Sequence, residues 1–327
     1  MDEIILGPHS LIPEILTHES QDFDSIFSSW TTKRYAPGME HARVVLVPAS
    51  WNGSGMRDCD TAVDIVAGGR GVKGEKETLP DGSVIVHSSA MSLVNKYVPR
   101  DDQHALGALT ELADLHDAHR SAINKLVPDA DDHTQWILRN TDIIKVFRMF
   151  QFVHKDDPYI VMDRMFEIFD GYILAGKDKQ LGRVEAKSAQ RFAGGKVALV
   201  FNKESTKTDY FLWNWGVEAV VFVDHKRNSI GVLRNKFMEK IICNDGTEFV
   251  ASHPKIREIV ESAGETIGES DAFWFVHPGN WLFSHGTKKA RQERSSKVNP
   301  MDLIRVLEEL LGTLQEPETD GPVCGLD

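Results

Sequence analysis

The sequence predicts an α/β protein with a doubly wound parallel-sheet N-terminal domain, a helical connector and a smaller α/β C-terminal domain. Short β-branched runs such as residues 42–48 alternate with segments of helical periodicity early in the chain, which is typical of a parallel sheet with crossover helices. Strand-like runs return after residue 196, where a long helical stretch has ended. The expected ranges are 1–130 for the N-terminal domain, 131–194 for the connector, 195–315 for the C-terminal domain and 316–327 for a mobile tail.

The N-terminal domain is expected to begin with a strand that ends in His18. A loop with Asp22 and Asp24 follows, and then a helix over residues 25–35, which Asp24 or Ser25 can cap. Further strands are predicted at 42–48, 61–66 and 83–86, and a helix at 88–97. Ligands bind beyond the carboxyl ends of the strands in such sheets, so His18 and the residues after Val63 should share one edge.

The middle of the chain carries apolar residues at helical spacing, and the last third returns to strand patterns. Helices are expected at 106–126, 134–152, 159–174 and 180–192. Beyond them, strands are expected at 197–201, 218–224, 229–234 and 272–276, with helices at 256–263 and 301–314. The short polar connection 225–228 predicts that the second and third of these strands form a hairpin.

Composition narrows the class of protein. The chain has 327 residues, a net charge of −12, and 41% apolar and 26% charged residues, as in ordinary soluble proteins. No apolar run reaches membrane-spanning length, and the N-terminus lacks a basic region followed by a hydrophobic core, so we expect a cytoplasmic protein without membrane contact. Its three scattered cysteines favour a reducing compartment and argue against a thiolate metal site. The net negative charge disfavours a protein whose main task is to coat a nucleic-acid duplex.

One imidazole and two carboxylates are predicted to converge where the first strand meets the first helix. His18, Asp22 and Asp24 offer the nitrogen and oxygen ligands that suit Mn²⁺ or Mg²⁺. The alternative interpretation is a polar loop with a capping Asp and a His that has no functional role. The residues alone leave the metal site and the polar loop both open.

The same residues resemble the first motif of the DHH phosphoesterase superfamily, which is H-x-x-x-D-x-D followed by a small residue. His18, Asp22, Asp24 and Ser25 fit it. The resemblance implies a second-motif aspartate at the end of a hydrophobic strand, for which Asp64 is our choice and Asp60 the alternative.

The resemblance further implies a fourth-motif aspartate on a later helix. We choose Asp117, with Asp114 as the alternative on the same helix face. The Asp-His-His triplet of the third motif does not occur in this chain, and the candidates nearest to its place are Glu75 and His87.

A glycine-containing, cation-rich loop near the C-terminus resembles in residue type the substrate loop of the DHH-associated domain. Backbone amides and cationic side chains there could form a phosphate-binding site. The expected substrate-binding residues are His277, Gly279, His285, Gly286, Lys288 and Arg291.

The resemblance therefore implies a Mn²⁺- or Mg²⁺-dependent phosphoesterase that hydrolyses a phosphodiester or phosphoanhydride. Its partner would be a phosphate-containing small molecule or a short single-stranded nucleic acid, and the chain could form a homodimer. Two other hypotheses stay open: a catalytically degenerate relative that binds a nucleotide or protein, and a metal-dependent hydrolase of other substrates. The residues implied as catalytic and metal-binding are His18, Asp22, Asp24, Asp64 and Asp117.

Overall fold

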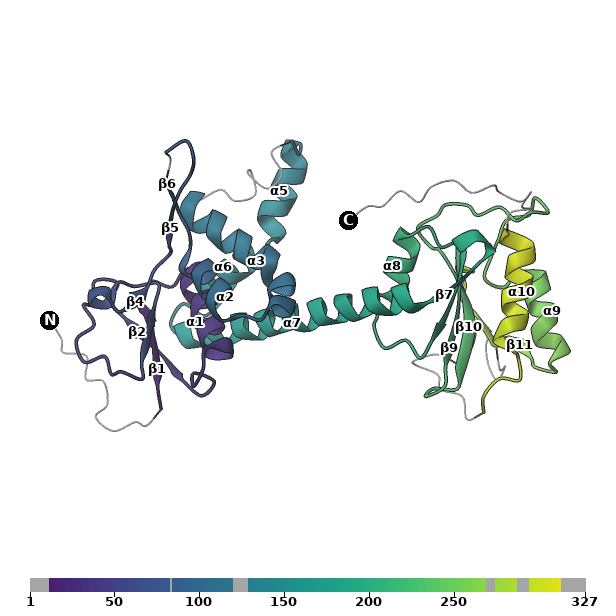
Figure 1. Ribbon diagram of the computed structural model, residues 1–327, viewed down its shortest axis with the longest axis horizontal. Coiled ribbons are helices and arrows are strands. Elements are labelled where there is room, and N and C mark those ends of the chain that lie inside the picture. The colour runs from purple at the N-terminus through teal and green to yellow at the C-terminus, as the bar shows by residue number, and fades with distance from the viewer. Residues whose placement is uncertain (1–11, 83, 120–128, 269–273, 287–293, 313–327) are drawn as a thin grey trace. The chain divides into compact units, whose positions relative to one another are not determined.

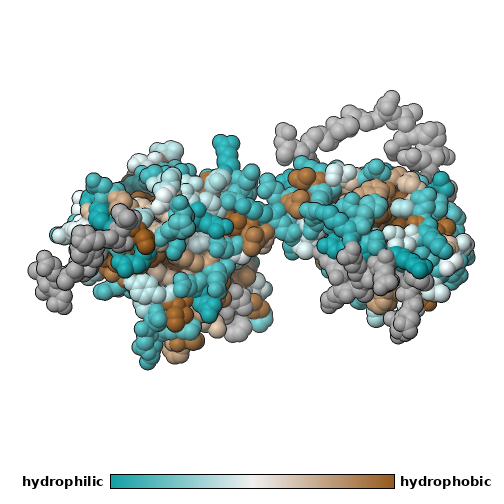
Figure 2. All heavy atoms as spheres, turned by 90° about the horizontal axis from the view of Figure 1, so that it is seen from below, coloured by the Kyte–Doolittle hydropathy of each residue, from teal (hydrophilic) through white to brown (hydrophobic). Residues whose placement is uncertain are grey.

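The computed structural model describes residues 12–82, 84–119, 129–268, 274–286 and 294–312 (Figure 1). Its contacts divide the chain into two compact units, Met1–Lys177 and Asp178–Asp327, which are described separately. Both units combine helices with a sheet, so the predicted α/β class is confirmed. No helix among the described residues is long and apolar enough to cross a membrane. On the face in Figure 2, polar side chains separate the apolar ones into scattered patches.

The first unit is organised around a four-stranded parallel sheet in the order β2-β1-β3-β4. Because all four strands run the same way, their carboxyl ends meet at one edge. His18 is the last residue of β1, and Asp64 directly follows β3. The strands are β1 (Glu14–His18), β2 (Arg43–Val47), β3 (Thr61–Val63) and β4 (Gly71–Val72).

One face of this sheet carries the helices of the unit. Phe23 and Phe27 of α1 pack against Phe169 of α7 with ring centroids 5.7 and 4.9 Å apart, in a core that also takes residues from β1, α2, α3 and α6. The helices are α1 (Phe23–Tyr35), α2 (Ser89–Tyr97), α3 (Arg100–His119), α5 (Asp132–Thr141), α6 (Ile143–Val153) and α7 (Pro158–Ser188), with a short 3₁₀ turn at Ala67–Gly69.

The other face of the sheet differs from the doubly wound arrangement that the sequence predicted. Leu16 and Val47 pack there against Trp51 and Met56, which lie in the loop between β2 and β3. Within the described residues, a loop therefore covers this face where a second helical layer was expected. The predicted strand at 83–86 also differs, because β6 (Val84–Val86) pairs antiparallel with β5 (Lys76–Thr78) in a separate hairpin.

The helical connector predicted over 131–194 is not a separate body. Residues 131–177 belong to the first unit, because Phe147 of α6 and Phe169 of α7 both lie against Phe23 in its core. The two helices predicted at 159–174 and 180–192 form the single helix α7, which ends at Ser188. Gly176 does not break it, and a Cβ there would lie 2.1 Å from the Cβ of Ala105, so glycine permits close packing on α3.

The second unit contains a seven-stranded mixed sheet in the order β11-β12-β13-β10-β9-β8-β7. The predicted hairpin is present as the antiparallel pair β9 and β10. Helix α8 covers one face with Leu212 and Trp213, and α9 and α10 cover the other with Ile256 and Leu303. The strands are β7 (Gln190–Phe192), β8 (Val197–Phe201), β9 (Ala219–Asp224), β10 (Ser229–Arg234), β11 (Ile267–Gly268), β12 (Trp274–Val276) and β13 (Leu282–His285), and the helices are α8 (Thr208–Asn214), α9 (Pro254–Ser262) and α10 (Pro300–Leu311), with a 3₁₀ turn at Ala193–Gly195.

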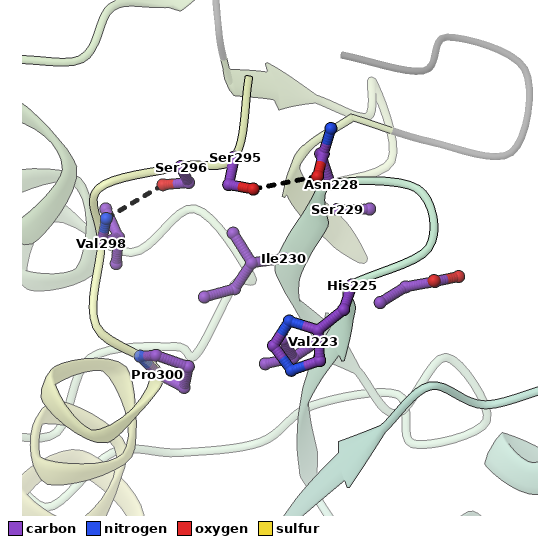
Figure 3. Close-up of a pocket in the computed structure, with 10 residues that line it drawn as sticks. Val223, His225, Asn228, Ser229, Ile230, Ser295, Ser296, Val298 and Pro300 are labelled. Carbon is purple, nitrogen blue, oxygen red and sulfur yellow. Dashed lines mark hydrogen bonds between the residues drawn. The ribbon is translucent and has the colours of Figure 1, made fainter. Parts of the chain in front are cut away.

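A pocket of about 170 Å³ lies beside the turn of the β9–β10 hairpin (Figure 3). Its lining includes His225, Asn228 and Ser229 from the hairpin, and Ser295 and Ser296 from the segment before α10. Ser295 Oγ donates a hydrogen bond to Asn228 Oδ1 at 2.9 Å and so ties the two sides together.

Candidate metal centre

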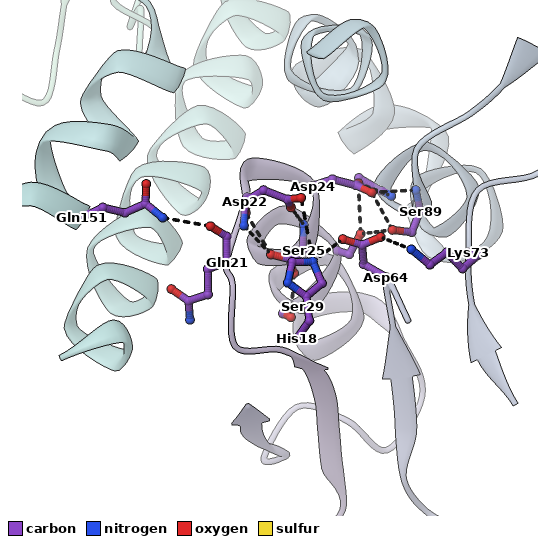
Figure 4. Close-up of polar contacts among 12 residues, drawn as sticks. His18, Gln21, Asp22, Asp24, Ser25, Ser29, Asp64, Lys73, Ser89 and Gln151 are labelled. Atoms are coloured by element: carbon purple, nitrogen blue, oxygen red, sulfur yellow. Dashed lines mark hydrogen bonds and ion pairs between the residues drawn. The ribbon is translucent and has the colours of Figure 1, made fainter. Parts of the chain in front are cut away.

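Three predicted ligands come together at the carboxyl edge of the parallel sheet (Figure 4). His18 Nε2 lies 2.9 Å from Asp64 Oδ2 and 3.8 Å from Asp22 Oδ2. One ligand atom from each residue lies within 4.8 Å of the others, and no other such group of three occurs in the described part of the chain. His18 and Asp64 thus meet in space although they are 46 positions apart in the sequence.

Local structure fixes the direction of the Asp22 carboxylate. Asp22 is the N-cap of α1, and its Oδ1 accepts a hydrogen bond from Ser25 N at 2.8 Å, while Ser25 Oγ accepts one from Asp22 N at 3.0 Å. This reciprocal capping box holds the first turn of the helix. Oδ1 of Asp22 therefore caps the helix, and Oδ2 faces His18.

Asp64 is held in an unusual backbone conformation. Its φ is +57°, in the left-handed region that few non-glycine residues adopt. The turn after it is tightly packed, because a Cβ on Gly71 would lie 1.8 Å from the carbonyl oxygen of Ile65. Asp64 N donates to Val72 O at 2.9 Å and fixes the start of this turn. Strain of this kind clusters at functional sites, and here it accompanies a carboxylate that contacts His18.

Asp24, the third acid of the first motif, has a different environment. Its side chain is buried and accepts hydrogen bonds from Ser89 N at 3.0 Å, Ser89 Oγ at 2.7 Å and Ala90 N at 2.8 Å. These donors lie at the start of α2, so Asp24 anchors that helix to α1. Burial first, and then the charge of Asp64, raise the pKa of Asp24 to about 7 against the effect of these hydrogen bonds. Its role as a metal ligand stays a prediction, and it is not in the group of three.

The helix α3 brings the fourth-motif candidates to this edge. Partial burial, and then the negative charges of Asp64 and Asp22, raise the pKa of Asp117. Asp114 instead contacts His87, whose Nδ1 lies 3.1 Å from Asp114 Oδ2. Asp117 is therefore the α3 carboxylate whose pKa is raised by the charges of this group, while Asp114 contacts His87.

The remaining alternatives of the second and third motifs have other partners. Asp60 is buried and forms an ion pair with Arg57, with Nη2 and Oδ1 2.6 Å apart, and it also accepts from Glu14 N. His87 Nε2 lies 3.0 Å from Glu77 Oε2 of the β5–β6 hairpin. Asp60 stabilises the loop before β3, and His87 links two acids instead of joining His18.

Sequence reasoning missed Lys73 and Ser89. Lys73 Nζ lies 3.4 Å from Asp64 Oδ1, and Ser89 holds Asp24. No spacing in the sequence indicated either contact, because both depend on how separate segments of the fold meet.

Four of the predicted substrate-binding residues lie in or near β12 and β13: His277, Gly279, His285 and Gly286. His277 packs on the Trp281 ring with centroids 4.4 Å apart and accepts a hydrogen bond from Gly279 N. His285 is 1% exposed, and the carbonyl oxygen of Gly286 accepts a hydrogen bond from a serine of β10. Their role in substrate binding stays a prediction, and Lys288 and Arg291 lie outside the described residues.

The donor set fits a divalent cation. The group offers two carboxylates, Asp22 and Asp64, and the imidazole of His18. These hard oxygen and borderline nitrogen ligands suit Mn²⁺ or Mg²⁺ and not a structural zinc. Gathering the carboxylates costs electrostatic energy, and after burial the charges of Asp64 and Asp22 are the next causes of the raised pKa of Asp117. A hydrogen bond to Asp64, opposed by burial, raises the pKa of His18. A cation bound among these groups would relieve the repulsion.

We expect the metal-free protein to lose stability as the pH rises from about 5 to 8. The folded-state pKa values of His18 and Asp24 are raised above their ordinary values of 6.5 and 3.8. At these two groups the folded state therefore binds more protons than the unfolded state in this range, so their contribution to the unfolding free energy falls with increasing pH. Urea unfolding in EDTA at several pH values measures this change in the unfolding free energy.

Mn²⁺ should reverse the trend at the upper end of that range, because the ion requires neutral His18 and ionised carboxylates. A His18→Gln variant serves as the control and should show a shallower decline in EDTA. A metal-free protein whose stability rises from pH 5 to 8 would contradict this account of the site.

Comparisons with known proteins do not place the chain in a family. No protein-family model and no curated protein matches it. Among solved structures, an uncharacterized protein from Helicobacter pylori G27 is 9% identical and covers 91% of this chain and 98% of its own, with a TM-score of 0.21. A TM-score this low supports no conclusion about fold or function, so the candidate metal centre rests on this chain's own residues.

Proposed function

We propose that the protein is a phosphoesterase dependent on Mn²⁺ or Mg²⁺, a divergent relative of the DHH superfamily that hydrolyses a phosphodiester or phosphoanhydride. The observation that carries the proposal is the meeting of His18, Asp22 and Asp64 at one edge of a parallel sheet. They come from two separate strand ends and a helix cap, in the chain order of the first two DHH motifs.

The roles of the side chains follow from their positions. His18 Nε2 and one oxygen each of Asp22 and Asp64 would hold the ion, which when bound activates water and polarises a phosphoryl oxygen. We assign Asp117 to the attacking water, because it is not in the group that would hold the ion and its charge interacts with those of Asp64 and Asp22. Asp24 keeps α2 in place beneath this group.

The substrate class follows from the same chemistry. A phosphate-containing small molecule or a short single-stranded nucleic acid would present the anionic oxygens that a divalent ion binds. The C-terminal residues His277, Gly279, His285, Gly286, Lys288 and Arg291 remain our candidates for holding its phosphate.

A second candidate is a relative that has lost catalysis and binds a nucleotide or a protein. Two observations favour it. The Asp-His-His triplet is absent from the sequence, and both oxygens of Asp24 are occupied by donors of α2 and α1.

The test of the first candidate is hydrolysis of bis(p-nitrophenyl) phosphate, a dinucleotide, a single-stranded oligonucleotide and pyrophosphate with Mn²⁺ or Mg²⁺. We expect activity on at least one of them that EDTA removes. Asp64→Asn should lower it by about 100-fold or more, because even residues behind the ligands contribute roughly 10–100-fold. Asparagine also tolerates the left-handed backbone of position 64.

Glu19→Gln is the matched control, since Glu19 is an exposed acid next to His18 that is not in the group of three. Its activity should equal that of the wild type. Tight Mn²⁺ binding without hydrolysis of any substrate would favour the second candidate, and equal activity in Asp64→Asn would contradict the first.

A further inference from the structure

The two oxygens of the Asp64 carboxylate face two different partners. Oδ2 lies 2.9 Å from His18 Nε2, inside the group of three, and Oδ1 lies 3.4 Å from Lys73 Nζ (Figure 4). The Asp64 side chain is 10% exposed, whereas that of Lys73 is 54% exposed. Lys73 follows β4 directly, so the sheet itself brings its ammonium to the outer side of the site.

Two-metal hydrolases hold their ions about 3.5–4 Å apart, a separation at which the two oxygens of one carboxylate can each contact one ion. Here the side of Asp64 on which a second ion would sit already holds a cation. The ammonium of Lys73 is positively charged. A second metal ion bound at the same oxygen of Asp64 would lie close to this ammonium, and the two positive charges would repel each other strongly. A second ion would therefore have to displace the ammonium.

The other groups that could hold a second ion are engaged. Asp24 is bound to the backbone of α2 through Ser89 and Ala90. His87 uses both ring nitrogens, one toward Asp114 and one toward Glu77. Within the described residues, the group His18, Asp22 and Asp64 is the only set of three that could hold an ion.

We propose that the site takes one divalent ion per chain, and that the Lys73 ammonium stands where a second ion would bind and contacts the substrate phosphate. This inference rests on the proposed function. The charges agree with it, since the Lys73 ammonium lies beside the Asp64 carboxylate and adds positive charge where Asp22 and Asp64 are gathered. An ammonium also donates charge-assisted hydrogen bonds to phosphate oxygens, and the half-exposed Lys73 can reach a ligand.

The first measurement is the number of Mn²⁺ ions bound by the full chain, from equilibrium dialysis with metal analysis, together with the electron paramagnetic resonance spectrum. We expect one ion per chain and the spectrum of isolated Mn²⁺. Two ions per chain with exchange-coupled spectra would overturn the inference while leaving the phosphoesterase proposal standing. No bound ion would overturn both.

The second measurement is the affinity of the Mn²⁺-loaded protein for inorganic phosphate. Lys73→Met should bind phosphate roughly tenfold more weakly, the effect of one lost charge-assisted hydrogen bond, and should still bind one Mn²⁺. The control is Lys76→Met, which removes an exposed lysine three residues away in β5 and should change neither quantity. Unchanged phosphate affinity in Lys73→Met, with a normal circular dichroism spectrum, would overturn the role of Lys73.

Discussion

Replacing Asp22 by asparagine is expected to weaken Mn²⁺ binding by about 100-fold or more without unfolding the protein. The loss follows because Asp22 Oδ2 is one of the three atoms that face one another at the site, and even supporting residues contribute roughly 10–100-fold to metal affinity. Stability is retained because asparagine caps helices as well as aspartate does, so the bond from Ser25 N to the cap survives. Calorimetric titration with Mn²⁺ measures the affinity.

The thermal midpoint of the metal-free variant in EDTA is the accompanying control. It should not fall, because removing one of several neighbouring carboxylates lowers the repulsion among them. Mn²⁺ affinity equal to that of the wild type would show that Asp22 is only a helix cap.

Replacing Asp24 by alanine should have the opposite profile, with a large loss of stability and little change in metal affinity. The variant leaves Ser89 N and Ala90 N without their acceptor inside the core. Each such buried donor costs about 1–3 kcal/mol, so we expect a loss of about 3 kcal/mol. For a folding unit of the size of Met1–Lys177 that corresponds to a midpoint lower by about 6–12 °C. Circular dichroism melting in EDTA measures it.

Mn²⁺ titration of the folded Asp24→Ala protein at low temperature completes this comparison. We expect an affinity within about tenfold of the wild type, since an anchoring residue acts less strongly than a ligand. A loss as large as that of Asp22→Asn, with an unchanged melting midpoint, would instead make Asp24 a metal ligand, as the first motif implied.

The sequence predicted those parts of the site that depend on local patterns. The apolar run before His18 marks where β1 ends. The start of α1 was predicted only approximately, because the helix begins at Phe23 with Asp22 as its cap and not at Ser25 with a cap at Asp24 or Ser25. The rule that ligands gather at the carboxyl edge of parallel strands then predicted that Asp64 would approach His18. Both steps use information within about ten residues plus one general rule of sheet topology.

Other parts could not be predicted, because they depend on contacts between distant segments. The motif implies that Asp24 is a metal ligand. Its hydrogen-bond donors Ser89 and Ala90, however, are 65 and 66 residues away in the sequence. The contact from Lys73 to Asp64 depends on the tight turn between β3 and β4, and no motif marks that lysine.

The fold departs from the expectation for similar reasons. Gly176 is a helix breaker by propensity, but in α7 it allows close packing on Ala105, so the helix continues. The three-residue run Val84–Val86 is too short to show whether it joins the main sheet or pairs locally with β5. Domain boundaries depend on which apolar faces meet, and periodicity alone does not say that Phe169 packs on Phe27.

The most direct test of the metal centre is a crystal structure of the protein soaked in Mn²⁺, with anomalous diffraction recorded at the manganese edge. The account predicts one anomalous peak within coordination distance, about 2.0–2.4 Å, of His18 Nε2 and of one oxygen each of Asp22 and Asp64. A well-occupied peak elsewhere with none at these residues, or no peak at all, would contradict it.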